Sequence, residues 1–312
     1  MAHHRSLDDL QLDRSWLTIG VFDGVHRGHQ VILRRLVAGA HAQALPAVVV
    51  TFFPSPAVVL RDLRDPVYLS MPDERADLLA ALGVDEVVTL EFTRQLASLS
   101  AADFMAWMKA RLGVVHLCAG FDFALGRGRE GTLPMLKQIG DQLGYSVAVV
   151  DPVADPQNGA ISSSRIRDLV ANGDIHTAAG LLGRRYAVNG VIVHGDGRGH
   201  GLGFPTANIA IPKQRLSPGF GIYATWITLR GQRLQAVTSI GVRPTFEQAY
   251  AEPRIEAHIL DLPGDPDLYD QPVRLEFVEY LRPEMRFSSI QDLIDQIHQD
   301  IQHSREVFSR DR

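Results

Sequence analysis

The alternation of short apolar runs with helix-like stretches is the feature that most constrains the fold of this chain. Between residues 16 and 150, runs of strand length alternate with segments whose apolar residues recur every three or four positions. This alternation is typical of β-α-β units with a parallel sheet buried on both faces. The predicted strands are 17–22, 47–53, 86–91 and 114–119, and the predicted helices are 30–42, 74–82 and 101–112. The first part of the chain is therefore expected to be an α/β domain with a Rossmann-like parallel sheet.

After residue 185 the pattern changes to β-rich runs separated by glycine, proline and aspartate. The predicted strands are 186–194, 221–229, 234–240, 254–260 and 273–280. Such spacing favours a small closed barrel or a sandwich. A terminal amphipathic helix over 288–308 is expected to pack against this barrel. Its predicted packing residues are Ile290, Leu293, Ile294, Ile297 and Ile301.

The segment between these two parts has a composition of its own. Residues 151–160 are rich in Asp, Pro, Asn and Gly without periodicity, as expected for a linker or a mobile loop, and helical patterns follow at 163–171 and 175–182. A length of 312 residues suits two domains, each with its own core. We therefore predict one domain over residues 1–160, a connecting helical segment over 161–184, and a second domain over 185–312.

Charge and composition limit the partners of the chain. A net charge of -5 gives no broad attraction to nucleic acid or anionic membrane, so a phosphate site has to be local. Residues 1–8 lack the apolar core of a signal peptide, and the chain has no apolar run of about 18 residues. We expect a cytoplasmic protein without nucleic-acid or membrane partners, whose oligomeric state the sequence leaves open. The single cysteine, Cys118, cannot form an internal disulfide, and its apolar run predicts a buried structural thiol.

The turn after the first predicted strand, residues 20–29, carries the string His-Arg-Gly-His and leads straight into a helix. Ligands bind at this edge of a parallel sheet, and a helix start offers free N–H groups to a phosphate. Gly28 separates the imidazoles of His26 and His29 and lets the backbone approach a nucleotide closely. One alternative is a helix-capping turn with two solvent-facing histidines. Another is a zinc site, for which no third ligand stands at a convincing spacing.

A second candidate anion site starts the helix predicted at 163–171. Residues 161–167 read Ile-Ser-Ser-Ser-Arg-Ile-Arg. Hydroxyls and free N–H groups at a helix N-terminus suit an anion, and Arg165 adds a planar fork for phosphate oxygens. The alternative is an ordinary serine cap followed by surface arginines.

A glycine-rich stretch, residues 190–203, opens the second domain with six glycines. Its backbone can fold around phosphates, but no Gly-Lys-Ser/Thr follows, so it is not a P-loop. A glycine-rich hairpin of a small barrel is the alternative. Pro205-Thr206-Ala207-Asn208 come next, and Thr206 and Asn208 offer the hard oxygen ligands that Mg²⁺ prefers. Two residues apart on a strand, they are expected to face the same side.

Together these segments resemble the bacterial bifunctional riboflavin kinase and FAD synthetase family. The histidine turn and residues 51–54, 120–123, 126–128 and 161–167 are similar, in order, to its H-x-G-H nucleotidylyltransferase half. Residues 194–208, 218–223, 240–246, 256–261 and 268–269 are similar to its riboflavin kinase half, which carries the Pro-Thr-Ala-Asn signature. The resemblance extends over about residues 17–308, and it implies that the second domain is a β-barrel of the six-stranded type.

For the first domain, the resemblance implies attack by a phosphate oxygen of FMN on the α-phosphorus of ATP, which gives FAD and pyrophosphate. The attacking phosphate is already anionic, so catalysis reduces to positioning and charge neutralisation. The implied catalytic residues are His26, His29 and Arg165. The implied ATP-binding residues are Gly20, Phe22, Asp23, Gly24, Gly28, Ser162 and Ser164, and the implied flavin-binding residues are Asp122 and Leu125. Because Ser55, Ala124 and Leu125 depart from the family pattern, a riboflavin kinase with weakened adenylyltransferase activity is an alternative.

For the second domain, the resemblance implies phosphorylation of riboflavin by ATP with Mg²⁺. The nucleophile is a neutral alcohol whose proton must leave, which calls for a base, and Glu256 matches the catalytic glutamate. A lone glutamate on an alternating strand is otherwise usually a solvent-facing residue. Thr206 and Asn208 are implied to bind Mg²⁺ and Gly195 and Gly203 to bind ATP, while Arg243 either contacts phosphate or closes an ion pair. The alternative of another class is a flavin-binding regulatory protein.

Overall fold

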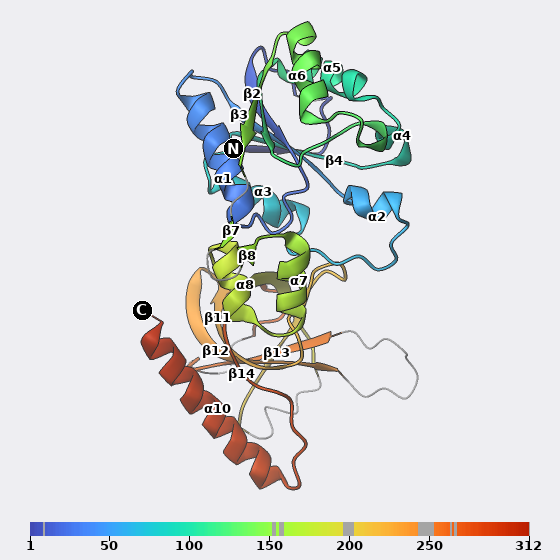
Figure 1. Ribbon diagram of the computed structural model, residues 1–312. Helices are drawn as coiled ribbons and strands as arrows, with labels where there is room; N and C mark the ends of the chain where they lie inside the picture. The colour runs from blue at the N-terminus through green and yellow to red at the C-terminus, as the bar shows by residue number, and fades with distance from the viewer. Residues whose placement is uncertain are drawn as a thin grey trace. The chain divides into compact units, whose positions relative to one another are not determined.

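The computed structural model of the protein describes residues 1–8, 10–151, 154–155, 159–195, 203–242, 253–262, 264 and 267–311. The chain divides into two compact units, Met1–Ser163 and Ser164–Arg312 (Figure 1). None of the helices in the described part of the chain is long and apolar enough to cross a membrane.

The first unit is built around a six-stranded sheet. Its strands are β1 (Ala2–His4), β2 (Ser15–Ile19), β3 (Ala47–Phe52), β4 (Glu86–Leu90), β5 (Val114–Gly120) and β6 (Ser146–Val150). They lie in the order β1-β4-β3-β2-β5-β6, and every paired strand is parallel to its neighbour. From β2 the chain adds β3 and β4 on one side and then returns to add β5 and β6 on the other. The strand order therefore reverses between β2 and β5, where open α/β sheets bind their ligands.

Helices cover both faces of this sheet. They are α1 (Arg27–His41), α2 (Pro56–Leu60), α3 (Pro72–Ala80), α4 (Arg94–Ala97), α5 (Ala101–Leu112), α6 (Leu133–Leu143) and the short 3-10 helix η1 (Arg127–Arg129). Successive residues of β3 alternate between two cores: Val48 and Val50 pack in a cluster with residues of α5 and α6, whereas Val49 packs with residues of α1 and α3. This burial on both sides explains a strand that is buried at every position and apolar at all but Thr51.

The segment predicted as a linker contains a small hairpin. β7 (Ala154–Asp155) and β8 (Gly159–Ala160) pair antiparallel. Two helices follow, α7 (Ser163–Ala171) and α8 (Ile175–Leu182), with the bounds that their apolar periodicity predicted.

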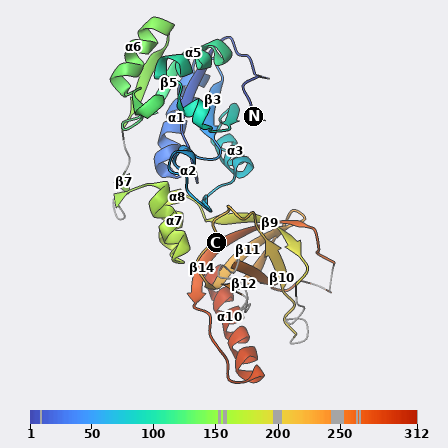
Figure 2. The same ribbon diagram turned by 90° about the vertical axis from the view of Figure 1, so that its right-hand side faces the viewer.

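The second unit is a closed antiparallel barrel with a terminal helix (Figure 2). Its strands are β9 (Ala187–Val193), β10 (Ala207–Ala210), β11 (Gly221–Leu229), β12 (Gln232–Val242), β13 (Pro253–Ile259) and β14 (Pro272–Arg282). They close in the order β10-β13-β12-β11-β14-β9, with β9 paired to β10. The predicted six-stranded barrel is confirmed.

The terminal helix α10 (Ile290–Arg310) packs on the barrel mainly through its C-terminal half. Val307 and Phe308 join a cluster with Ala224 of β11, and Ile301 packs against the same cluster. The prediction that Ile290 packs as well is wrong: it is 66% exposed. Ile290 is the first residue of the helix, at the end away from the packed cluster.

Cys118 lies in β5, is fully buried and forms no disulfide, as its apolar run predicted. Burial raises the pKa of its thiol to about 11. The thiol therefore stays protonated at neutral pH, as expected of a structural residue.

Candidate active sites

The two histidines of the first turn form a stacked pair at the start of α1. His26 is the N-cap, and its Nδ1 accepts a hydrogen bond of 3.3 Å from the backbone N–H of His29. The ring centroids of His26 and His29 lie 3.6 Å apart with an interplanar angle of 17°. Phe22 meets the His29 ring edge to face at 5.2 Å. The predicted pair is thus held by its own turn, beside the point where the strand order reverses.

His29 is a neutral imidazole at physiological pH. Burial holds its pKa well below the ordinary value of 6.5, and the nearby His26 and Arg75 lower it further. Its Nδ1 is buried and has no hydrogen-bond partner among the described residues. A neutral imidazole at a helix start, with a buried nitrogen that lacks a hydrogen-bond partner among the described residues, is suited to a hydrogen bond with a phosphate oxygen.

The turn that carries these rings needs its glycines. A Cβ at Gly20 would lie 2.9 Å from Cε2 of Phe22, and one at Gly28 would lie 3.2 Å from the His26 ring. Phe22 and Val25 have φ angles of 49° and 42°, which are rare for bulky or β-branched residues. Strain of this kind gathers at functional sites, where the surrounding structure holds it. The turn also ends β2 at Ile19, three residues before the predicted end of the strand at residue 22.

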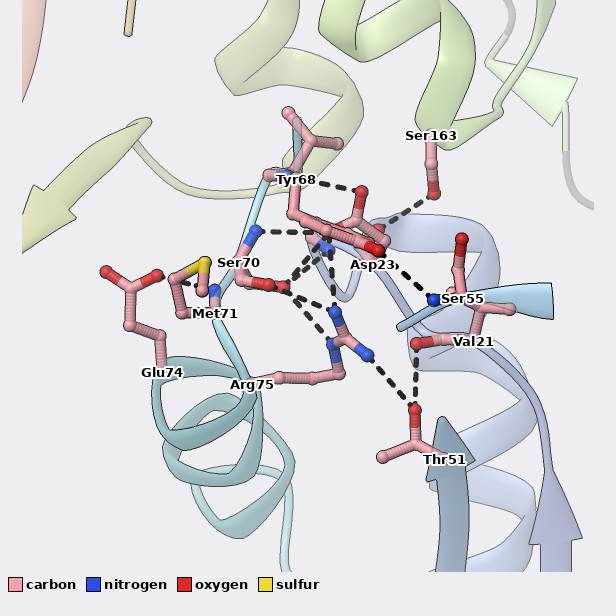
Figure 3. Close-up of polar contacts among 12 residues, drawn as sticks. Val21, Asp23, Thr51, Ser55, Tyr68, Ser70, Met71, Glu74, Arg75 and Ser163 are labelled. Atoms are coloured by element: carbon pink, nitrogen blue, oxygen red, sulfur yellow. Dashed lines mark hydrogen bonds and ion pairs between the residues drawn. The ribbon is translucent and has the colours of Figure 1, made fainter. Parts of the chain in front are cut away.

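Asp23 is buried, and protein donors occupy its carboxylate. It accepts hydrogen bonds from the backbone N–H groups of Leu69 (3.2 Å) and Ser70 (3.0 Å) (Figure 3). The guanidinium of Arg75 lies 3.7 Å from the same carboxylate. The neighbouring Gly24, with φ of 76°, donates its N–H to Ser70 Oγ at 2.9 Å. The sequence analysis did not single out Ser70 or Arg75.

The loop after β5 holds the two residues predicted to bind flavin. Asp122 is exposed, and its backbone carbonyl accepts a hydrogen bond of 3.0 Å from Arg129. Leu125 is half-buried against the core, and its backbone pairs with Gly131. Phe121, which the sequence analysis did not weigh as a ligand residue, is 55% exposed at this edge. The turn after β2 and the loop after β5 follow adjacent strands, so both flank the strand-order reversal.

The Ser-Ser-Ser-Arg segment lies at the junction of the two units. Ser162 is exposed, while Ser163 donates a hydrogen bond of 2.8 Å to the backbone carbonyl of Asp23 (Figure 3). Ser164 and Arg165 belong to the second unit, where Ser164 Oγ accepts from Arg167 at 3.0 Å and Arg165 is half-buried. The serine brought to the histidine turn is Ser163, which was not among the predicted site residues.

The barrel carries the second constellation on its outer face. Asn208 of β10 and Glu256 of β13 are paired in register, and each is flanked along its strand by buried apolar residues. Arg254 Nε donates to Asn208 Oδ1 at 2.9 Å and lies 2.6 Å from Glu256 Oε1. The side chains of Arg254 and Glu256 are 29% and 32% exposed. The structure thus brings Asn208 and Glu256 together through an arginine that the sequence analysis missed.

Two further features shape this site. Thr206 immediately precedes β10 and, like Asn208, is half-buried. Gly195 follows β9, and a Cβ there would lie 1.9 Å from Asn208 Nδ2, so a side chain at this position would displace the amide. Gly203 has a φ of 85°. The glycine-rich loop over 196–202 and Arg243 lie outside the described residues.

A second carboxylate lies near the first. Partial burial raises the pKa of Glu284, and the charge of Glu256 raises it further against the opposing effect of Arg282. Glu284 Oε1 would be 2.0 Å from a Cβ at Gly241, so this glycine gives the carboxylate its place against β12. The sequence analysis did not select Glu284.

Comparison with known proteins identifies the family. A family model described as FAD synthetase matches residues 9–165, and one described as riboflavin kinase matches residues 182–308. A curated bifunctional riboflavin kinase/FMN adenylyltransferase of Listeria monocytogenes is 34% identical over 310 residues, covering 99% of this chain and 97% of that protein. The chain belongs to this bifunctional family. Its relative in Escherichia coli K12 bears the same name and is 36% identical over 294 residues, covering 94% of this chain and 92% of that protein.

A solved structure agrees with the fold. A crystal structure described as a macrolide-efflux protein from Streptococcus pneumoniae superposes with a TM-score of 0.88 at 32% identity, covering 97% of this chain and 98% of that one. The predicted family, the enzyme class and the fold class of an α/β domain followed by a barrel are therefore confirmed.

Proposed function

We propose that the barrel, over residues 185–312, transfers the γ-phosphoryl group of ATP to riboflavin, giving FMN and ADP. Glu256 accepts the proton of the attacking riboflavin hydroxyl while the bond between the γ-phosphorus and its bridging oxygen breaks. Gly195 and Gly203 bind ATP by allowing close approach of the backbone. The contacts of Asn208 and Glu256 support this role, because the guanidinium of Arg254 brings their side-chain oxygens together.

The chemistry of the side chains supports an Mg²⁺ site here. The carbonyl oxygen of Asn208 and the hydroxyl of Thr206 are hard oxygen ligands, which Mg²⁺ prefers. In the proposed site Thr206 and Asn208 would hold the ion, which would neutralise charge on the ATP phosphates.

We propose further that the α/β domain, over residues 1–160 with the connecting segment 161–184, adenylylates FMN. A phosphate oxygen of FMN attacks the α-phosphorus of ATP and pyrophosphate leaves, without a general base. His26 and His29 contact the ATP phosphates, and residues 20–28 bind ATP through their backbone. Asp23 takes part through its backbone, since protein donors occupy its carboxylate. In this proposal Ser162, Ser164 and Arg165 steady the triphosphate, and Asp122 and Leu125 contact the flavin.

The two reactions then run in sequence from riboflavin through FMN to FAD, with ATP consumed in each. We propose that they take place in the cytoplasm, and that nucleic acid and membrane are not partners.

The observation that carries the proposal is the stacked histidine pair with a neutral His29 at the strand-order reversal, together with the Asn208–Arg254–Glu256 constellation on the barrel. Purified protein incubated with riboflavin, ATP and Mg²⁺ tests it, with flavins separated by chromatography. FMN should form first and FAD later. Accumulation of FMN without FAD would leave only the kinase, and tight flavin binding without either product would favour a regulatory protein.

A further inference from the structure

Arg75 is a fully buried arginine at the centre of a hydrogen-bond network in the first unit (Figure 3). It lies in α3, whose start is fixed by a hydrogen bond of 2.8 Å from the backbone N–H of Met71 to Glu74. Its guanidinium donates four hydrogen bonds. The acceptors are Ser70 Oγ (3.4 Å), Ser70 O (3.0 Å), Thr51 Oγ1 (3.2 Å) and Phe52 O (3.3 Å).

The acceptors of Arg75 are themselves bonded to the histidine turn. Thr51, in β3, donates its hydroxyl to the carbonyl of Val21 at 2.9 Å. Ser70 Oγ accepts the N–H of Gly24 at 2.9 Å and donates to the Asp23 carboxylate at 3.3 Å. Each side of the guanidinium therefore reaches the turn through one intermediate hydroxyl. The turn carries strained φ angles that need such outside support.

The charge of Arg75 also reaches the histidines. It is one of the causes that lower the pKa of His29, after burial and His26. Asp23 lies 3.7 Å from the guanidinium and partly offsets its charge. The guanidinium of Arg75 thus links the end of β3, the segment before α3 and the turn, which is more than filling space in the core requires.

We propose that Arg75 is a positioning residue for adenylyl transfer, holding residues 21–24 through Thr51 and Ser70 so that the His26–His29 pair is set toward the ATP phosphates. This inference rests on the adenylyltransferase activity proposed above. Arg75 touches neither substrate, and its effect passes through the two hydroxyls and the turn.

The alternative is a residue that matters only for the stability of the first unit, because removing one partner of a buried ion pair is destabilising. The two roles differ in what a variant does while it is still folded. Loss of stability alone lowers the melting temperature and leaves kcat and KM unchanged well below it. Loss of positioning lowers kcat for FAD formation at a temperature where the variant is fully folded.

The test uses the full chain with Thr51→Val, Thr51→Ser, Arg75→Lys and Arg75→Met. Thr51→Val keeps the shape but removes the hydroxyl that joins Arg75 to Val21, and we expect kcat for FAD formation from supplied FMN to fall roughly tenfold. Thr51→Ser keeps the hydroxyl and should have a kcat for FAD formation close to that of the wild type. Arg75→Lys keeps the charge but loses the fork, and should lower kcat by roughly 10- to 100-fold. FMN formation from riboflavin is the internal control and should stay unchanged in each.

A readout independent of turnover is the NMR titration of the His29 ring, assigned with His29→Asn. Arg75→Met removes one positive neighbour and should move the titration to higher pH, whereas Arg75→Lys should not. If Arg75→Met does not fold, Thr51→Val and Arg75→Lys decide the matter alone. Wild-type kcat in both, with only a lower melting temperature, overturns the inference. Failure of the proposed function is distinct, because the wild type would then form no FAD.

Discussion

Replacing Gly195 by alanine should damage the kinase site by displacing one amide. The added Cβ would stand 1.9 Å from Asn208 Nδ2 and 2.8 Å from its Oδ1. To regain ordinary van der Waals contact, the amide has to move by about 1.5 Å. Because this amide is the end of a flexible side chain, the barrel itself can remain folded. A displacement of about 1 Å in a reacting site can cost roughly 10²-fold in rate, so we expect FMN formation to fall by about two orders of magnitude.

The assay measures FMN formed from riboflavin and, separately, FAD formed from supplied FMN. The apparent Mg²⁺ requirement of FMN formation should rise in Gly195→Ala, since Asn208 is a proposed ligand, while FAD formation should be unchanged. Gly180→Ala is the matched control. A Cβ at Gly180 meets nothing within 4 Å, and the residue lies in the helix α8, where alanine is favoured over glycine by about 1 kcal/mol.

The reasoning would be refuted if Gly195→Ala formed FMN at the wild-type rate with the wild-type Mg²⁺ requirement. It would also be refuted if both activities fell together with the melting temperature, because the substitution would then act on folding and not on one amide.

Four other outcomes follow from the same sites. Glu256→Gln should lower FMN formation by about 10² to 10⁴-fold and spare FAD formation from supplied FMN; equal loss of both would argue against separate sites. His29→Ala should do the reverse, and normal FAD formation would remove it from the mechanism. Because the pKa of His29 is depressed in the folded protein, the His29 ring binds a proton in the unfolded chain but not in the folded chain as the pH falls below 6.5. Between about pH 7.5 and 5.5 the wild type should therefore lose more unfolding free energy, measured with urea, than His29→Asn, and parallel curves would count against this. With a pKa of about 11, Cys118 should resist iodoacetamide in the native protein at about pH 8 and react once the chain is unfolded; rapid native labelling would contradict its burial.

Periodicity was enough to predict most of the fold. The bounds predicted for α5 and β11 are those of the structure, because a strongly patterned run between polar or glycine punctuation leaves little choice. Errors lie where a special turn overrides the pattern. The first strand ends early because Phe22 leaves the extended conformation, and α1 starts before residue 30 because His26 caps it.

The functional residues that the sequence analysis missed are those whose role depends on partners distant in the chain. Arg75 sits in an amphipathic helix, where an arginine is normally taken as a solvent-facing residue, and its burial depends on acceptors from β3 and from residue 70. Arg254 could have been noticed, since it stands two residues before Glu256 and so shares its face of the strand. Its bond to Asn208 joins β13 to β10 and has no signal in either segment alone.

The two sites differ in how they place a carboxylate, which is enclosed at the histidine turn and partly exposed on the barrel. The proposed nucleophiles give a reason for this difference. At the histidine turn the rings are stacked, His29 is neutral, and the carboxylate of Asp23 is enclosed by backbone donors and a buried arginine. An anionic FMN phosphate approaching ATP would be repelled by an exposed carboxylate and needs no base. On the barrel, an alcohol needs a carboxylate close to ATP, which is itself anionic. In the proposed kinase site, Arg254 beside Glu256 would offset that repulsion, so that a proton acceptor and the phosphates could share one site. The two proposed reactions therefore place different electrostatic demands on their sites, and the chain meets these demands in two separate units.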